Sequence, residues 1–376
     1  MSQLSGKKLY FWINAVAGLA IFFFGYDQGM MGGVNTSPHY VDTMNLGYST
    51  YEGESEGYVV TITNPTRQGG IVSIYYLGTL IGCIIAGVTG DQLGRLKTMF
   101  IGCLWVMVGA ALQCSAQNLA WMLCARVING IGTGYLNAIV PVWSAEVATH
   151  TSRGAFIAVE FTLNIFGVVV AYWLEFGLGF VGDGRSEVRW RFPIAFQILP
   201  EAFEDEQLLE HVLGNWVRGS THRSASSTEY LVTNIARMAG YGARKSQWLS
   251  GLNDVTYCLS TLFAIYTIDR WGRRIGLWWG AVGQGISIIL AGVFSRLLKD
   301  HSDKAAQYGG AAAFFVFLYT AIFGATWLTI PWVYPTETFP LEVRAKGNAW
   351  GVVGWSIGNG WLMMLNPVMF NNIGEK

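Results

Sequence analysis

The chain has 376 residues, of which 52% are hydrophobic and 13% are charged, against about 25% charged in an average soluble domain. Its formal net charge is zero, which gives no reason to expect a nucleic-acid partner. A soluble protein of this composition would expose large apolar patches. The 16 tryptophans fit the aromatic belts at the two faces of a bilayer, so the composition indicates a membrane protein.

The first apolar run follows Lys7 and Lys8 and continues through Tyr26 without a small-residue cleavage site, so we interpret it as a retained span. A spanning helix needs about 20 mainly apolar residues. The runs that qualify are approximately 11–33, 70–89, 97–117, 119–142, 155–178, 247–268, 274–297, 311–334 and 348–370. The stretch 189–200 is too short, 229–241 is weak, and the polar stretches 34–69 and Glu201 to Ser227 are expected to be loops.

Lysine and arginine in short loops indicate the cytosolic side. The basic residues before the first span and after the second and fourth place the N-terminus in the cytosol and the stretch 34–69 outside. The basic loop after 247–268 also belongs inside, which requires either two spans or none between 178 and 247. These loop residues are Lys7, Lys8, Arg95, Lys97, Arg153, Arg270, Arg273 and Arg274.

Two charged motifs occur twice in the same order, which indicates a duplicated chain. Asp91-Gln-Leu-Gly-Arg95 returns as Asp269-Arg-Trp-Gly-Arg273. Val142-Trp-Ser-Ala-Glu146 returns as Val333-Tyr-Pro-Thr-Glu337, and in both copies an arginine follows the glutamate by seven residues (153 − 146 and 344 − 337). Transporters that work by alternating access include folds of two such parallel repeats, which rock about a site near the midplane.

Each cytosolic edge therefore carries acidic residues near arginines. Arginine can bind a carboxylate through two parallel hydrogen bonds. We expect pairs between the moving bundles to latch the cytosolic face; the alternative is that the charges only set topology. The candidate gating residues are Asp91, Arg95, Glu146, Arg153, Asp269, Arg273, Glu337 and Arg344.

Asp27 and Arg126 are ionisable residues inside predicted spans, where charge is costly and usually functional. We expect them to form a couple that binds and releases a proton as its surroundings change; the alternative is a static buried ion pair. Gly130, Gly132 and Gly134 are expected to permit close helix packing. The five cysteines have no metal-ligand spacing and no strand-borne nucleotide motif appears, so we expect neither an enzyme nor a cofactor.

The chain resembles the sugar porters of the major facilitator superfamily, of the kind found in fungi. The residues that carry the resemblance are Gly25-Tyr-Asp-Gln-Gly29, Gly90-Asp-x-x-Gly-Arg95, Arg126 with its glycines, Ser144-Ala-Glu146 with Arg153-Gly154, Trp190-Arg-Phe-Pro193, Asp269-Arg-x-Gly-Arg-Arg274, Pro331-Trp332, and Pro335-Thr-Glu-Thr338 with Arg344-x-Lys-Gly347. The matches cover most of 10–200 and 245–365.

The resemblance implies a monomeric, all-α protein of two helical bundles in the plasma membrane, which moves a sugar or polyol, in many members together with a proton. By the resemblance, Asp27 is the proton carrier with Arg126 as its partner, and Trp332 packs against the sugar, since an aromatic face suits a pyranose ring. Gln284 and Asn359 are further candidate contacts to the substrate.

The chain also departs from the family pattern. Leu199-Pro-Glu201 leads into an unrelated charged stretch, the amides of the seventh helix are missing, and Phe161, next to Glu160, stands where the fifth helix usually has a glutamine. We expect an N-terminal bundle over 1–200, an aberrant linker over 201–246 and a partial C-terminal bundle over 247–376, with about 9–11 spans in place of 12. The alternatives to a working transporter are a truncated or mis-spliced, inactive paralogue and a sugar sensor.

Overall fold

The computed structural model describes residues 22, 25–51, 53, 58–147, 153–198, 232–233, 235–237, 239, 241–301, 304–340 and 343–374. We refer to the described residues up to 198 as the N-terminal half and to those from 232 as the C-terminal half.

In the N-terminal half, residues 25–34 are helical and are followed by the short helix α2 (Pro38–Thr43). The antiparallel hairpin of β1 (Gly47–Tyr51) and β2 (Tyr58–Ile62) comes next, with Ser49 opposite Val60. The long helices of this half are α3 (Pro65–Gln92), α4 (Arg95–Cys114), α5 (Leu119–Val147) and α6 (Arg153–Leu178). The 3-10 turn η1 (Val181–Gly184) leads to the short helix α7 (Val188–Phe196).

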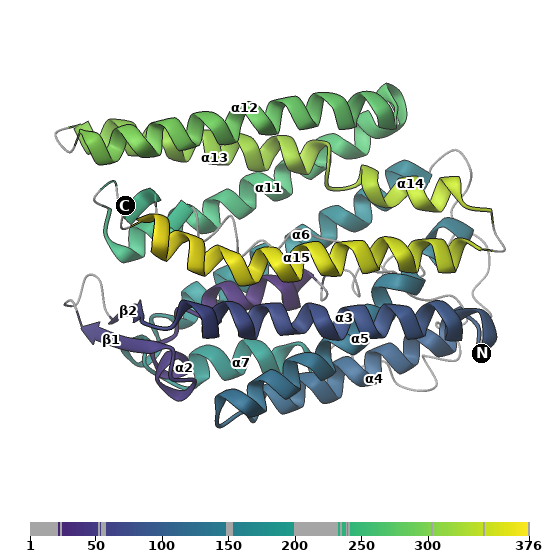
Figure 1. The fold of residues 1–376 in the computed structure, drawn as a ribbon, viewed down its shortest axis with the longest axis horizontal. Helices are drawn as coiled ribbons and strands as arrows, with labels where there is room; N and C mark the ends of the chain where they lie inside the picture. Colours follow the sequence, from purple (N-terminus) through teal and green to yellow (C-terminus); the bar gives the residue numbers. More distant parts are fainter. Residues whose placement is uncertain are drawn as a thin grey trace, which may run out of the picture.

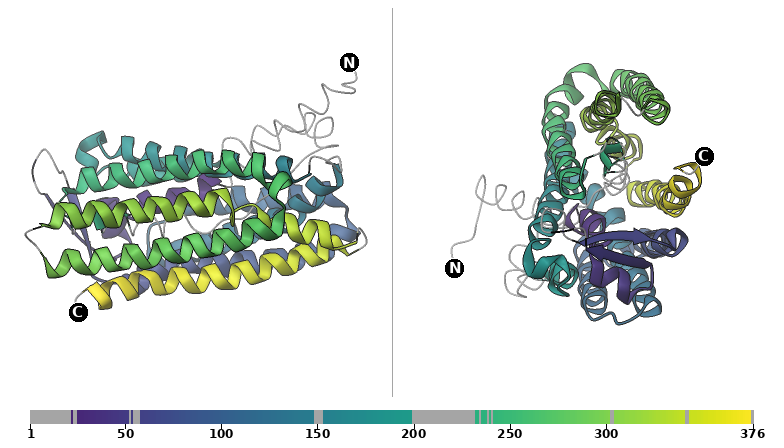
Figure 2. Two further views of the ribbon diagram at one scale, coloured as in Figure 1. Left: turned by 90° about the horizontal axis from the view of Figure 1, so that it is seen from above. Right: turned by 90° about the vertical axis from the view of Figure 1, so that its left-hand side faces the viewer.

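The C-terminal half contains α11 (Ala243–Trp271), α12 (Arg273–Asp300), α13 (Ala305–Ala325), α14 (Ile330–Thr338) and α15 (Arg344–Gly374). The long helices of both halves run side by side along the long axis of the molecule (Figure 1). The β-hairpin lies at one end, which we call the hairpin end, and the loops with the repeated charged motifs lie at the other, which we call the motif end (Figure 1). Seen along the helices, the two halves stand next to each other, with α15 beside α3 (Figure 2).

Most predicted spans in the described residues correspond to single helices that extend beyond the apolar run at one or both ends. The predicted span 311–334 lies within the candidate membrane span Ala305–Tyr334, but it is not one continuous helix, because α13 ends at Ala325 and α14 begins at Ile330 after a turn. Pro331 explains the break: without an N–H it is tolerated in the first turn of a helix but not in its interior. The stretch 34–69 was expected to be a loop, but it contains α2, the hairpin and the start of α3.

Five helices among the described residues are both long and apolar enough to cross a membrane: Pro65–Gln92, Lys97–Cys114, Ala158–Leu178, Arg273–Asp300 and Ala305–Tyr334, the last of which passes through the turn into α14. The start of the predicted span 11–33, most of 229–241 and the predicted loop Glu201 to Ser227 lie outside the described residues.

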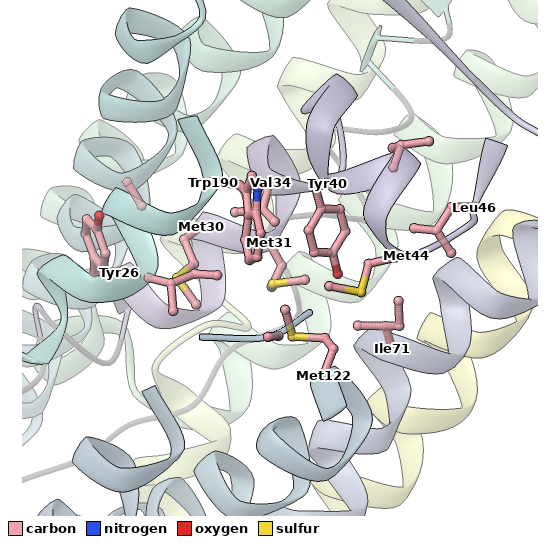
Figure 3. Close-up of a cluster of buried hydrophobic side chains, with 14 residues drawn as sticks. Tyr26, Met30, Met31, Val34, Tyr40, Met44, Leu46, Ile71, Met122 and Trp190 are labelled. Carbon is pink, nitrogen blue, oxygen red and sulfur yellow. The ribbon is translucent and has the colours of Figure 1, made fainter. Parts of the chain in front are cut away.

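A thioether-rich core holds the hairpin end of the N-terminal half together (Figure 3). The side chains of Met30, Met31 and Met44 are almost fully buried there beside Tyr40 and Trp190. Methionine adapts to irregular gaps and packs well on aromatic rings. This core therefore fixes α2 and the hairpin on the helix of residues 25–34 and on α7.

Glycines bring the backbones of α3 and α5 into direct contact. A Cβ atom on Gly78 would lie only 2.9 Å from the Cα of Gly130, and one on Gly130 would clash with the backbone carbonyl of Tyr75. Gly134 meets α3 in the same way at Thr79, whereas Gly132 faces α4. The expectation that the glycines after Arg126 permit close helix packing is confirmed.

Gly130→Ala should therefore force α3 and α5 apart and lower the free energy of unfolding by about 1–3 kcal/mol. Gly285→Ala is the matched control, because nothing lies within 4 Å of a Cβ at that position of α12. Thermal unfolding of the purified protein in detergent measures both. Gly285→Ala should be neutral or slightly stabilising, because alanine is the better helix former, so an equal loss for both variants would contradict the role of the close contact at Gly130.

The two halves also meet along α3 and α15, and polar groups pair across this seam. The hydroxyls of Thr79 and Ser356 lie 2.9 Å apart. Toward the motif end, Asn348 of α15 is fully buried and its Nδ2 donates to the backbone carbonyls of Asn137 (3.3 Å) and Ala138 (3.0 Å) in α5. In a regular helix the Asn137 carbonyl would accept from residue 141, but that residue is Pro141, which has no N–H. The side chain of Asn348 thus supplies the donor that the proline removes.

Asn348→Ala should cost about 1–3 kcal/mol of unfolding free energy, because a buried carbonyl loses its donor. In a Pro141→Ala background the helix can supply that N–H itself, so the same substitution should cost less there. A double-mutant cycle on detergent-solubilised protein measures the coupling. Strictly additive effects of the two substitutions would contradict the assignment.

Candidate functional site

Asp27 and Arg126 lie in the interior of the N-terminal half. Asp27 belongs to the helix of residues 25–34 and Arg126 to α5, and their side chains are 4% and 3% exposed. Two ionisable groups this deeply buried need compensating partners. The sequence places both in the interior of spans, and the structure brings them into the same part of the bundle.

The carboxylate of Asp27 accepts hydrogen bonds from two side chains that the sequence analysis did not single out. The hydroxyl of Tyr75, on α3, donates to Oδ2 at 2.9 Å. The amide of Asn129, on α5, donates to Oδ1 at 3.2 Å. Asn129 follows Arg126 by one helical turn, so its position on the same face could have been found from the helical period. Tyr75 and its neighbour Tyr76 are the two aromatic residues of this span, and no sequence signal shows which of them faces Asp27.

In the described part of the chain Arg126 forms no ion pair with Asp27, and the side chain of Tyr75 contacts both groups. Its guanidinium carbon lies 4.6 Å from the centre of the Tyr75 ring, and its Nη1 donates to Oε1 of Gln113 at 3.3 Å. Among the described side chains, which include both residues, no ion pair joins Asp27 to Arg126. The expected Asp–Arg couple is therefore a three-residue arrangement with an aromatic ring in the middle.

Several further polar atoms around this arrangement are buried without a hydrogen-bond partner among the described residues. They are Nε of Arg126, Nε2 of Gln113, Oδ1 of Asn129 and the hydroxyl of Tyr40. Buried polar atoms usually find partners, and those that do not often mark a functional site. The surroundings of Asp27 and Arg126 thus contain hydrogen-bonding atoms whose capacity is not used by the described residues.

A series of contacts between aromatic rings connects this region to the C-terminal half. The rings of Tyr75 and Tyr76 meet edge to face with centroids 5.4 Å apart, and Tyr76 meets Trp355 of α15 in the same way at 5.4 Å. Trp355 then packs on Trp332 of α14 at 6.4 Å. Nδ2 of Asn359 donates to the backbone carbonyl of Trp355 at 3.0 Å. Two of the candidate substrate residues, Trp332 and Asn359, are thus close to one another at the seam.

Gln284, the third candidate substrate residue, belongs to α12, which packs mainly on α13 at the outside of the C-terminal half (Figure 2). For the described residues, no hydrogen bond or ring contact links it to Trp332 or Asn359. Its Nε2 is buried without a partner among them. The sequence could not distinguish this helix from one that faces the seam.

Phe161, which stands where a glutamine was expected, lies in an apolar cluster between the halves. It is 3% exposed and packs with Ile165 of α6, Tyr257 of α11, and Leu328 and Val333 near α14, and Trp332 packs against the same cluster. The departure from the family pattern therefore replaces an amide by an apolar contact between α6 and helices of the C-terminal half.

The charged motifs at the motif end form equivalent structures in the two halves. Gly94 and Gly272 both have positive φ, 86° and 79°, which favours glycine and produces the same turn. Nη1 of Arg95 donates to the carbonyl of Gly90 (2.8 Å), and Nη1 of Arg273 to the carbonyl of Ile268 (3.2 Å). The duplication inferred from the sequence thus extends to backbone conformation and hydrogen bonding.

The arginines of these motifs form their ion pairs within each half. Arg95 pairs with Asp91 (2.8 Å) and Glu146 (3.4 Å), and Arg273 holds both oxygens of Glu337 at 3.2 and 2.7 Å. Burial alone would lower the pKa of Arg95, but Asp91 and Glu146 raise it above its ordinary value, so the guanidinium stays charged. These pairs brace each half.

One pair crosses the seam at this end. Nζ of Lys346 lies 3.8 Å from Oδ2 of Asp91. Nε of Arg344 donates to the carbonyl of Phe339 at 3.3 Å. The side chains of Arg153 and Asp269 lie outside the described part of the chain.

Arg273→Lys should lower the free energy of unfolding by roughly 1 kcal/mol, because an ammonium cannot hold both oxygens of Glu337 and the Ile268 carbonyl together. The neighbouring exposed residue provides the control, Arg274→Lys. Urea unfolding followed by tryptophan fluorescence compares the variants. Equal stability of the two variants would mean that the bidentate geometry of Arg273 and Glu337 adds nothing beyond the positive charge that lysine also carries.

Comparison with known proteins gives consistent matches. The sequence model described as "Sugar (and other) transporter" matches residues 13–203 and 225–376 and leaves 204–224 unmatched. Sugar transporter STL1 of Saccharomyces cerevisiae is 26% identical over 445 residues, which cover 98% of this chain and 74% of that protein. The MFS-type transporter oryC of Aspergillus oryzae is 27% identical over 448 residues, which cover 99% of this chain and 80% of that protein.

The alignment with oryC is longer than the 376-residue chain, so at least 72 aligned positions (448 − 376) have no residue opposite them here. Among solved structures, the MFS proton:xylose symporter XylE bound to 6-bromo-6-deoxy-D-glucose has a TM-score of 0.71 at 19% identity, covering 96% of this chain and 89% of that one. XylE from E. coli in a partially occluded inward-open conformation has a TM-score of 0.69 at 18% identity, covering 96% and 91%. The fold is that of the major facilitator superfamily.

Proposed function

Because the chain belongs to the sugar (and other) transporter family, we propose that it carries a monosaccharide or polyol across a membrane together with a proton. The observation that supports a role in proton transport is the burial of Asp27. Its two carboxylate oxygens accept hydrogen bonds from Tyr75 and Asn129, and the charge of Arg126 lies nearby. A carboxylate with replaceable donors and a nearby cation can release a proton in one state and hold it in another. The relatives named as a sugar transporter and a proton:xylose symporter support the same function.

In this proposal the substrate binds at the seam, near Trp332 and Asn359, with Gln284 as a more distant contributor. Two bundles, 1–200 and 247–376, rock about that seam as a monomer in the plasma membrane, with the N-terminus and the motif end in the cytosol. The braced charge motifs support this, since each lets its half move as a unit. Phe161 and its apolar neighbours favour a substrate that presents an apolar face.

Asp27→Asn should abolish accumulation against a gradient and leave substrate exchange, because an amide cannot take up and release the proton. The measurement is uptake of labelled D-xylose, D-glucose and glycerol into proteoliposomes with an imposed pH gradient, with counterflow as the second readout. Asp300→Asn is the matched control, since that carboxylate is exposed and pairs only with Arg296 one turn away. Undiminished uphill uptake by the Asp27 variant would refute the proton role.

A further inference from the structure

We propose that Tyr75 is the positioning residue of the proton site, whose hydroxyl orients the carboxyl of Asp27 while its ring holds Arg126. This inference rests on the proposed role of Asp27 and deepens it. Among the described residues, Tyr75 touches both charged groups, and no ion pair joins the two charges directly. Any exchange of position between them must therefore move this side chain.

The hydroxyl fixes one of the two oxygens of Asp27. Tyr75 donates to Oδ2 and Asn129 to Oδ1, so the carboxylate is held from both sides. A hydrogen bond to a charged acceptor is about twice as strong as one between neutral groups. When Asp27 takes up a proton, the bond from Tyr75 loses that advantage and the side chain becomes easier to displace.

The ring fixes the guanidinium. Arg126 lies 4.6 Å from the ring centre and forms its other contact with Gln113, a neutral amide. The negative face of an aromatic ring attracts a cation, most strongly where water is excluded. The titratable groups that surround Tyr75 are Asp27 from the first helix, Arg126 from α5 and Tyr76 from its own helix.

The backbone at Tyr75 cannot move independently of the site. Its carbonyl lies against Gly130 of α5, at the point where a Cβ would clash. Asn129, the other donor to Asp27, is the residue next to Gly130. The contact between α3 and α5 thus sets the distance between the two donors. Because the backbone of Tyr75 is held in place, we expect protonation of Asp27 to change the position of the Tyr75 side chain.

The side chain of Tyr75 also has a route to the other half. Its ring meets Tyr76 edge to face, and Tyr76 packs on Trp355 of α15. Displacement of Tyr75 on protonation would therefore disturb a contact across the seam. The proton site and the moving interface are connected by these neighbouring rings.

The test is infrared difference spectroscopy of the full chain in liposomes during a pH change, which requires no substrate. Asp27→Asn identifies the carboxyl band of Asp27. Tyr75→Phe keeps the ring over Arg126 and removes the hydroxyl, so we expect it to shift that band. Tyr48→Phe, at an exposed position of β1, should leave the band in place. If Tyr75→Phe does not fold, 3-fluorotyrosine at position 75 keeps the ring and hydroxyl, strengthens the donor and should also shift the band.

In proteoliposomes with a pH gradient, Tyr75→Phe should reduce the accumulation of D-xylose, D-glucose or glycerol, whichever the unaltered protein accumulates, by about tenfold, which corresponds to about 1.4 kcal/mol. The counterflow rate should fall less than accumulation, which separates coupling from general damage. A band that is unmoved by changes at position 75 would overturn the role of Tyr75 while leaving Asp27 as the proton carrier. The absence of any band that Asp27→Asn removes would overturn both proposals.

Discussion

The contact between the backbones of α3 and α5 is the constraint on which the rest of the N-terminal half depends. Within lipid there is little hydrophobic gain from pairing two apolar helices, so close packing and hydrogen bonds must hold them. Gly78, Gly130 and Gly134 allow the two backbones to touch. The same contact places Tyr75 opposite Asn129, so packing and the charged site follow from one feature of the sequence. A wider spacing would separate the donors of the Asp27 carboxylate.

The two copies of the charged motif have the same construction, and their arginines pair within their own half. In each half an arginine joins the helix carbonyl before it to a glutamate further along the chain. Such a brace makes the end of each half rigid. The contacts between the halves include polar pairs, such as Lys346 with Asp91 and Thr79 with Ser356, and aromatic and apolar packing, such as Tyr76 on Trp355. Two halves that are each braced by their own ion pairs and packed along one seam fit the rocking motion proposed above.

The sequence predicted the all-α membrane fold, the duplication and the burial of Asp27 and Arg126, because long apolar runs, repeated motifs and charge within a span each have a direct physical cause. It did not predict the break between α13 and α14, because hydropathy alone does not register that Pro331 prevents a continuous helix. It also could not identify Tyr75, since the role of that tyrosine depends on which face of α3 meets α5. The peripheral position of Gln284 was missed for the same reason. A single sequence indicates which segments are helical, but it does not show which helices pack against each other.

The seam between α3 and α15 has a consequence for biosynthesis. Thr79 and Ser356 are 277 residues apart, so α3 enters the membrane long before the helix that covers it has been made. At about 5–20 residues per second, the ribosome needs tens of seconds to bridge that interval. During this time Thr79 and the ring of Tyr76 lack their partners Ser356 and Trp355 on α15. The face of α3 that carries Thr79 and Tyr76 is therefore completed only when α15 has been made.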